Sequence, residues 1–404
     1  MTPNRAYLSA ADAANALGIS RPTLYAYVSR GQLRSEPMPG RPKARRYYRE
    51  DIERLRQLKA VRHDPQNAGA RGLHWGGPVL ESGITLIDGG RVYFRGRDGV
   101  ALAESATLED VAAWLWQASD AEQPRLGRQR PALTPAELSR VRRLTRDPLA
   151  QMQAALAAAA TRDLAALDLT PRAVRLAGAR ILQVLAATIA RGSSAAPLHA
   201  RLQQAWAADA PDAANAIRAA LVLCADHELN VSAFTARCVA SAGASPYDVV
   251  SAALAALKGY RHGGASERML AILARVDSCA DAKAELTARL RRGEPIPGFG
   301  HPLYPDGDPR ARLLLQLAQA SRQHSAWRSV RNVWTAGQAL LDEAPNLDFG
   351  LAAIAHAYGL PPRAPIALFA IGRTVGWIAH AMEEYAAGQL IRPRARYVGP
   401  PPSR

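Results

Sequence analysis

The chain has only three cysteines, Cys224, Cys238 and Cys279, and they lie far apart in the sequence. Three scattered thiols cannot build a disulfide framework or a cysteine-ligated metal cluster. We therefore expect these side chains to act as small, buried packing residues.

Long apolar runs are also absent. Arg, Asp or Gly interrupts the longest of them well before the roughly 18 residues that a membrane-spanning helix requires. The start of the chain, Met1–Arg5, leads straight to a polar helix signal and lacks the apolar core of a secretory signal. These absences predict a soluble, cytoplasmic protein with no membrane contact.

Several sequence motifs of nucleotide binding and catalysis are missing as well. The chain contains no Walker loop, no dinucleotide-binding fingerprint, no Gly-x-Ser-x-Gly elbow and no spacing typical of metal ligands. We therefore expect no metal and no tightly bound cofactor.

Acidic residues are in deficit, because 51 Lys and Arg face 35 Asp and Glu, for a net charge of +16 over 404 residues. The excess is densest in residues 1–65, where 13 Lys and Arg oppose 6 Asp and Glu. Such a charge suits nucleic acid or a phosphorylated ligand, and it also favours solubility. The length fits one small and one large unit.

Residues 1–62 have the pattern of a small winged helix-turn-helix domain. Ser9–Asp12 is a capping-box start for a first helix, which Gly18 ends. Ser20 can cap a second helix, and Gly31 follows its last turn.

A basic segment between turn residues, Pro37–Arg46, is expected to form the wing, and Tyr47–Asp51 to start a third helix. The residues from Leu8 to Tyr25 resemble MerR/excisionase-type DNA-binding domains. A helical module for protein contacts is the alternative, because this fold can persist after DNA binding is lost. The candidate DNA contacts are Arg21, Thr23, Tyr27 and Arg30 in the second helix, and Arg41, Lys43, Arg45 and Arg46 in the wing.

The rest of the chain reads as mainly α. Residues 63–76 have the Gly and Pro content of a linker. Ile84–Ile87 and Val92–Phe94 alternate well enough to form a hairpin across Asp88–Gly90. Beyond it, apolar residues recur every three or four positions in the segments 108–116, 135–144, 149–167, 171–190, 197–207 and 211–223.

The densest group of reactive side chains lies in Ile296–Ala311. It places His301, carboxylates and Arg310 in a Gly- and Pro-rich loop just before an apolar helix. Gly298 and Gly300 are expected to let the backbone approach a ligand closely. This combination predicts an active-site loop.

Five other segments carry His, Asp or Arg at intervals. They are Asp226–Ser232, Lys258–Ala265, Pro345–Phe349, Ile371–Gly376 and Ile391–Tyr397. With the His301 loop they make six segments in the order found in citrate synthases, which the chain resembles over roughly residues 77–400. The resemblance implies a two-domain helical fold, with a large domain of about 77–265 and 352–400 and a mobile small domain of about 266–351.

The resemblance also implies the reaction, in which acetyl-CoA condenses with oxaloacetate to give citrate and coenzyme A. By this resemblance Asp348 takes a proton from the acetyl methyl group, His262 hydrogen-bonds the thioester oxygen, and His301 polarises the ketone. No cofactor is implied, because the thioester is a substrate. The other histidines are expected in surface or packing roles: His63, His74, His199, His324, His356 and His380.

Substrate binding follows from the same resemblance. Arg310 and Arg373 match positions that hold the oxaloacetate carboxylates, with a further contact from His227. Arg392 matches an arginine donated by the partner subunit, so a homodimer is implied; a solvated basic tail is the alternative. The implied coenzyme A contacts are the backbone of Pro297, Gly298, Phe299 and Gly300 and the side chains of Arg261, Arg291, Arg292 and Arg394, while Gly259, Gly263 and Gly264 would let the thioester approach.

Two residues depart from the family pattern. Ser266 stands where asparagine is frequent, and Pro305 stands where many members have a basic residue near the coenzyme. The acyl group therefore stays open, and 2-methylcitrate synthase, which uses propionyl-CoA, is an alternative. Cleavage of citryl-CoA is another, and so is a DNA-binding regulator that uses the citrate synthase fold as a metabolite sensor.

Overall fold

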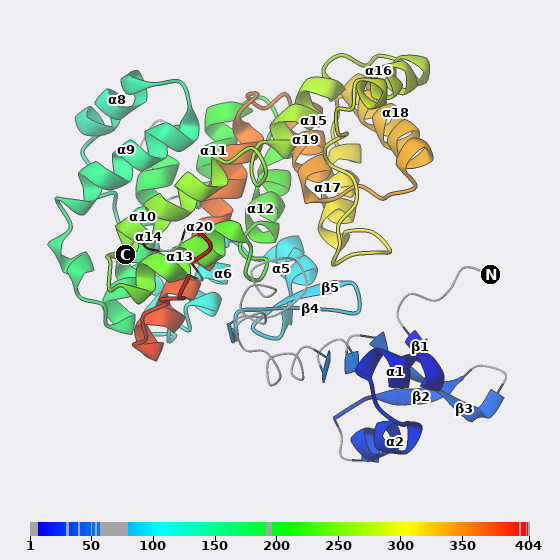
Figure 1. The fold of residues 1–404 in the computed structure, drawn as a ribbon. Coiled ribbons are helices and arrows are strands. Elements are labelled where there is room, and N and C mark those ends of the chain that lie inside the picture. The colour runs from blue at the N-terminus through cyan, green and yellow to red at the C-terminus, as the bar shows by residue number, and fades with distance from the viewer. Residues whose placement is uncertain are drawn as a thin grey trace. The chain divides into compact units, whose positions relative to one another are not determined.

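The chain divides into two compact units, residues 1–81 and 82–404, which Figure 1 draws in one colour ramp. Each unit is described by itself. The structure is a computed structural model, and it describes residues 7–29, 32–38, 41–49, 51–52, 55–56, 80–190, 196–395, 397–400 and 402. The predicted linker and the side chains of Arg30, Arg41 and Lys43 lie outside the described part.

The described part of the first unit includes helices α1 and α2 and an antiparallel sheet of strand order β1-β3-β2. Ser9 caps the first helix by accepting a hydrogen bond from the Asp12 N–H at 3.2 Å, and Gly18 ends it with φ 58°. Tyr47, expected in a helix, is instead buried in the sheet, and helical geometry begins only after Tyr48. The elements are β1 Tyr7–Ser9, α1 Ala10–Leu17, α2 Arg21–Ser29, β2 Ser35–Met38 and β3 Arg41–Tyr48.

The second unit opens with the predicted hairpin, which is confirmed. Its strands pair antiparallel, with Leu86 opposite Tyr93. A short third strand, β6, pairs with β5 and was not predicted from the sequence. The strands are β4 Thr85–Asp88, β5 Arg91–Phe94 and β6 Arg97–Asp98.

Helices make up most of the second unit, so the mainly α expectation is confirmed. The six predicted helices are present, but the segment 149–167 breaks after Ala160 and resumes as a 3-10 turn. Capping boxes at Thr107 and Thr134 set two of the starts. The elements are α5 Gly99–Ser105, α6 Leu108–Leu115, α7 Gln123–Gly127, α8 Pro135–Leu144, α9 Pro148–Ala160, η1 Leu164–Leu167, α10 Pro171–Ile189, α11 Leu198–Trp206, α12 Ala213–Leu223, α13 Val231–Ser241 and α14 Pro246–Leu257.

The next five helices gather into a group of their own, seen in yellow and orange in Figure 1. The chain then returns to the larger group through one long final helix. The elements are α15 Ala265–Leu273, α16 Cys279–Arg291, α17 Pro309–Gln319, α18 His324–Leu341, α19 Leu347–Ala357 and α20 Ala364–Ala387.

Helix α20 is the central core element. By length and composition it could cross a membrane, but 89% of its apolar window is buried by the protein itself. It packs against α10, α12, α13 and α14. Gly376 brings it so close to the end of α12 that its N–H donates to the Ala225 carbonyl at 2.9 Å. This contact fixes the segment that carries Asp226 and His227.

The cysteines are free thiols. Cys224 is buried as expected and Cys238 is half-buried, but Cys279 is exposed at the start of α16, so the expectation of buried packing is wrong for it. Outside the candidate site, His324 is exposed and His380 is fully buried.

Candidate active site

The loop before the third histidine is held against the start of α19. Gly298 and Gly300 each form a backbone hydrogen bond of 2.9 Å with residues 344–346. Both glycines have positive φ, 85° and 69°, which side chains disfavour. A Cβ at Gly298 would lie 3.1 Å from the Phe349 Cβ, and one at Gly300 would overlap Glu343. These glycines therefore permit close packing of the loop against the start of α19, and their approach to a ligand stays a prediction.

His301 has a defined tautomer. The Leu303 N–H donates to its Nδ1 at 3.2 Å, so the proton of the neutral ring sits on Nε2. Burial, reinforced by the charge of Arg310, lowers the pKa of His301 to about 4. At neutral pH the ring is therefore an uncharged N–H donor.

His227 lies beside His301, with ring centroids 5.0 Å apart in an edge-to-face arrangement. Its Nε2 is 3.0 Å from the Tyr304 hydroxyl, and burial, followed by the charges of Arg310 and Arg373, holds its pKa well below the usual value. Tyr304 is buried and also lies 5.0 Å from the His301 ring. No role for this tyrosine was inferred from the sequence, although it lies within the His301 loop.

Arg310 is fixed at the start of α17. Its Nε and Nη2 donate to the two Asp308 oxygens at 2.9 and 2.8 Å. Burial disfavours the charge of Arg310, but the Asp308 carboxylate raises its pKa above the usual value. The bidentate pair leaves Nη1 for a substrate carboxylate. Asp308 also accepts from the Leu347 N–H at 3.0 Å, which ties α17 to α19.

Arg373 reaches the same cluster from α20. Its Nε donates to the Cys224 carbonyl at 2.6 Å, and its guanidinium lies 4.6 Å from the centre of the Phe369 ring. Burial lowers the pKa of Arg373. The charge of Arg373 in turn lowers the pKa of His227 and His262, after burial, which shows that all three groups lie close together.

His262 is anchored by Ser232. The serine hydroxyl donates to Asn230 Oδ1 at 2.7 Å and accepts from Trp377 Nε1 at 3.2 Å, while His262 Nε2 lies 2.9 Å from the same oxygen. Because the single serine proton goes to Asn230, His262 Nε2 carries a proton and donates to Ser232. Burial, followed by Arg373, lowers the pKa of His262 to about 4, so the ring is neutral.

The glycines after His262 serve the local turn. A Cβ at Gly263 would overlap the Leu257 carbonyl, and Gly264 has φ 79°. The local turn therefore requires glycine at both positions, and the approach of the thioester stays a prediction.

Asp348 lies in the first turn of α19, behind the N-cap residue Asn346. Burial raises the pKa of Asp348, while Arg310 and the backbone and hydroxyl of Ser266 oppose the rise. His227 and His301 are in contact, and the charges of Arg310 and Arg373 act on the histidines and on Asp348, so these residues form the candidate site.

A buried polar network surrounds Asp226, the residue before His227. Asp226 accepts from the Thr85 hydroxyl at 2.6 Å and lies 3.3 Å from His380 Nε2. Arg237 lies 3.5 Å from the other ring nitrogen of His380 and is paired with Glu384. Within the described ranges, no group of three or more His, Cys, Asp or Glu side chains is arranged to hold a metal ion.

In the described part of the chain, the predicted coenzyme and partner arginines form no hydrogen bond or ion pair with this cluster. Arg392 and Arg394 are exposed in the C-terminal segment, and Arg291 is exposed at the end of α16. Arg261 donates to the Tyr260 hydroxyl at 2.9 Å, and Arg292 is paired with Glu294 at 2.6 Å.

The predicted DNA-contacting residues differ in exposure and in their hydrogen-bond partners. Arg21 is exposed. Thr23 bonds to the helix-capping Ser20, and Tyr27 is half-buried against the small core, which corrects its expected outward orientation. In the wing, Arg45 donates to the Ser35 hydroxyl at 2.8 Å and Arg46 to Glu36 at 2.7 Å.

Comparison with known proteins identifies the family of the chain. The citrate synthase C-terminal domain family matches residues 72–394, and a helix-turn-helix domain family matches residues 7–57. The chain is 33% identical to the citrate synthase of Haloferax volcanii over 363 residues, 81% of this chain and 95% of that protein. The match to citrate synthase 2 of Bacillus subtilis is 38% identical but spans only 47% of this chain and 52% of that relative.

Solved structures give the same result. The citrate synthase of Thermotoga maritima superposes with a TM-score of 0.69 at 26% identity, covering 83% of this chain and 97% of that one. A ternary complex of carboxymethyl coenzyme A and oxaloacetate with the Thermoplasma acidophilum citrate synthase gives 0.69 at 25% identity, with the same two coverages. Because the citrate synthase family matches most of the chain and the Haloferax volcanii citrate synthase is covered to 95%, the chain belongs to the citrate synthase family.

Proposed function

We propose that the protein condenses acetyl-CoA with oxaloacetate to give citrate and coenzyme A. The observation that carries this proposal is the neutral His301, which has its proton on Nε2, lies against His227 and is close enough to the buried Arg310 for that charge to lower its pKa. Arg373, a second buried cation, likewise lowers the pKa of His227. A ketone flanked by carboxylates is the ligand that suits such a site, because the guanidinium groups bind the carboxylates and the imidazole polarises the carbonyl. His227 adds a polar contact.

The acetyl group must first lose a methyl proton. Asp348 is the proposed base, and burial, which raises its pKa, makes it a better proton acceptor. The resulting enol carbon attacks the oxaloacetate ketone, whose oxygen takes up the developing negative charge next to His301. Water then cleaves the thioester and releases citrate and coenzyme A.

His262 would stabilise the enol oxygen, and this requires a proton on its free Nδ1. In the structure the ring proton is on Nε2, donated to Ser232. If the Ser232 hydroxyl turns from Asn230 to His262, it donates to Nε2, and the imidazole proton moves to Nδ1. Ser232 thus controls which nitrogen of His262 carries the proton.

Domain closure, the dimer and coenzyme binding are proposed on the same family resemblance. The small domain, about residues 266–351, closes over both substrates and excludes water. A homodimer supplies Arg392 to the partner's site, the 297–300 backbone holds the adenine, and no cofactor is needed. A cytoplasmic location stays a prediction.

The proposal is tested by mixing purified protein with oxaloacetate and acetyl-CoA and measuring free thiol with a thiol-reactive dye. Turnover that needs both substrates supports it. A folded protein that releases no thiol with acetyl-CoA or propionyl-CoA contradicts it.

Propionyl-CoA is the second candidate substrate, because the chain is also 36% identical to the 2-methylcitrate synthase of Shewanella oneidensis over 188 residues. One extra methylene changes transition-state binding by only about 1–3 kcal/mol. The ratio of kcat/KM for the two thioesters decides between them.

A regulatory role is the candidate from another class, and the helix-turn-helix match at residues 7–57 favours it. Salt-dependent, sequence-selective DNA retention that disappears when residues 1–65 are deleted would support it. Absence of DNA binding at low salt would exclude it.

A further inference from the structure

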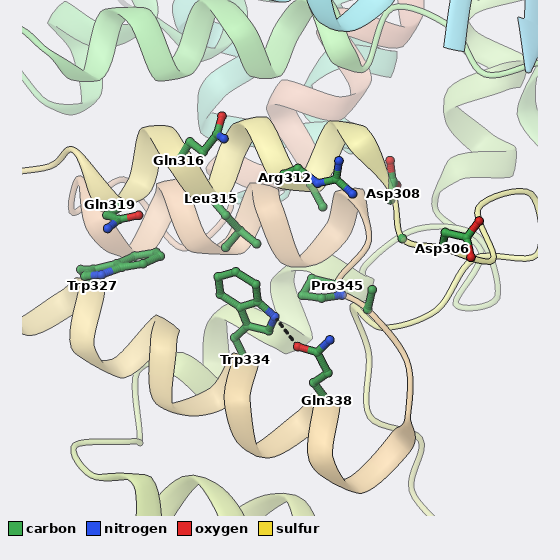
Figure 2. Close-up of a pocket in the computed structure, with 13 residues that line it drawn as sticks. Asp306, Asp308, Arg312, Leu315, Gln316, Gln319, Trp327, Trp334, Gln338 and Pro345 are labelled. Carbon is green, nitrogen blue, oxygen red and sulfur yellow. Dashed lines mark hydrogen bonds between the residues drawn. The ribbon is translucent and has the colours of Figure 1, made fainter. Parts of the chain in front are cut away.

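A second cavity lies between α17 and α18, outside the histidine and arginine cluster. Its volume is about 310 Å³, and it is closed at one end by residues 306–308 and 344–345. Figure 2 shows Leu315 on α17 pointing toward Trp327 and Trp334 on α18. Of the residues assigned to substrate or coenzyme binding, none lines it. It shares Asp308 with the candidate active site, and there this carboxylate is already paired with Arg310.

Aromatic side chains are concentrated in this cavity. The chain has only seven Trp in 404 residues, yet two of them, Trp327 and Trp334, line the same face of α18. Both are half-buried. Two partly exposed indoles beside the buried Leu315 make a flat apolar surface, and flat rings bind to such surfaces by stacking.

The polar groups around the indoles are carboxamides. The Trp334 Nε1–H donates to Gln338 Oε1 at 3.0 Å, drawn as the dashed line in Figure 2. The bond fixes the amide orientation and leaves the Gln338 NH₂ group for a ligand. Gln316 and Gln319 line the cavity from α17. Carboxamides pair well with the donor and acceptor edges of nitrogen heterocycles.

Charged side chains also line the cavity. Arg312 is exposed, lines the cavity and has no ion-pair partner in the described part of the chain. Asp306 lines the same end of the cavity. A guanidinium suits a phosphate or carboxylate, and a carboxylate suits sugar hydroxyls. The volume lies at the small end of the range for ligand pockets, which favours one ring system over a dinucleotide.

We propose that this cavity binds a planar nitrogen heterocycle that carries one anionic group, with a nucleoside monophosphate as the best match. The ring lies against Trp327 and Trp334, the carboxamides bind its edge, Arg312 binds the anion, and Asp306 accepts from the sugar hydroxyls. The site is independent of the condensation reaction, so binding can be measured without turnover.

The test is calorimetric titration of the full-length protein with adenosine monophosphate, adenosine, inorganic phosphate and indole-3-acetate. We expect the monophosphate to bind at one site per chain. Arg312→Gln should weaken it at least tenfold and leave adenosine unchanged, since only the anion contact is lost. Trp334→Leu should weaken both. Arg331→Gln is the matched control, because Arg331 is exposed on α18 but does not line the cavity.

Comparison of these ligands also shows whether the bound anion is a phosphate or a carboxylate. Tighter binding of indole-3-acetate than of the monophosphate would keep the aromatic-anion site and assign a carboxylate ligand. Saturable binding of neither, or binding that Arg312→Gln and Trp334→Leu leave unchanged, overturns the proposal. Complete displacement by coenzyme A, with Arg312→Gln weakening both ligands, would assign the cavity to the acyl-CoA site and also overturn it.

Discussion

At the scale of single residues, burial sets the charge of the groups in the candidate site. His262 and His301 are uncharged because burial disfavours the protonated imidazole. The Asp308 carboxylate favours protonation of His301, but burial has the larger effect on its pKa. Asp348 is pushed toward protonation by the same cause, which suits a group that must accept a proton. Three predictions follow at this scale.

The first concerns the base. Asp348→Ala should lower kcat at least about 100-fold, because the methyl proton has no acceptor, while the affinity for oxaloacetate changes little. Thiol release gives kcat, and calorimetry gives the affinity. Asp277→Ala, which removes an exposed carboxylate outside the site, is the control. Near-normal turnover of the Asp348 variant would remove it from the role of base.

The second concerns Ser232. Ser232→Ala should lower kcat by about 10- to 100-fold, since His262 loses the partner that sets its tautomer, with little change in oxaloacetate affinity. Ser329→Ala removes another buried serine hydroxyl, on α18, and should keep kcat. Equal losses in both variants would mean that the Ser232 effect is structural only.

The third concerns pH. His262 and His301 have pKa values of about 4 in the folded protein and near 6.5 when unfolded. Between these values the unfolded state binds more protons, so the free energy of unfolding falls as the pH drops from 6.5 toward 4. Urea unfolding at pH 7 and pH 5 should show a smaller loss in a His262→Gln, His301→Gln double variant than in the parent. Identical losses would contradict the burial argument.

At the scale of elements, the contact between α20 and the end of α12 decides where His227 lies. A Cβ at Gly376 would lie 2.5 Å from the Ala225 carbonyl and would overlap the Asp226 carboxylate. Neither neighbour can move freely, because Asp226 is fully buried.

Gly376→Ala should therefore lower the free energy of unfolding by about 1–3 kcal/mol, as overpacking does, and should weaken oxaloacetate binding by displacing His227. Gly127→Ala at the end of α7 meets open space and should change stability by less than about 1 kcal/mol. Denaturant unfolding compares the two variants. Equal stabilities would show that the close approach is not required.

At the scale of the whole molecule, the proposed homodimer rests on Arg392. This residue is exposed in the single chain, and the family resemblance implies that it acts in the partner's site. A symmetric dimer would place two copies of the C-terminal segment at two sites.

Mixing of two inactive variants tests this arrangement. After subunit exchange, Asp348→Ala and Arg392→Ala chains should recover about one quarter of the parent activity, because half of the dimers are hybrids and each hybrid has one intact site. In the control, Asp348→Ala chains are mixed with chains that carry both substitutions. This mixture should recover no activity, because neither chain supplies Asp348. No recovery in the first mixture would place Arg392 in its own subunit's site or outside any site.

The sequence by itself determined the fold class and the helix-turn-helix domain, and it predicted the residues of the candidate site. Helix starts were readable because capping depends on a few adjacent residues, as at Ser9 and Thr134. The site residues were readable because His301, Arg310 and Asp348 lie in short segments whose order matches a known family.

The tertiary structure alone decided the tautomers, the role of the glycines and the second cavity. Ser232 meets Trp377, and Gly376 meets Asp226, only after helices far apart in sequence have packed. Trp327 and Trp334 lie on one helix, and only the facing surface of α17 makes them walls of a cavity. The physical reason is that capping and helix periodicity are local, whereas hydrogen-bond partners and burial depend on which distant segments come into contact.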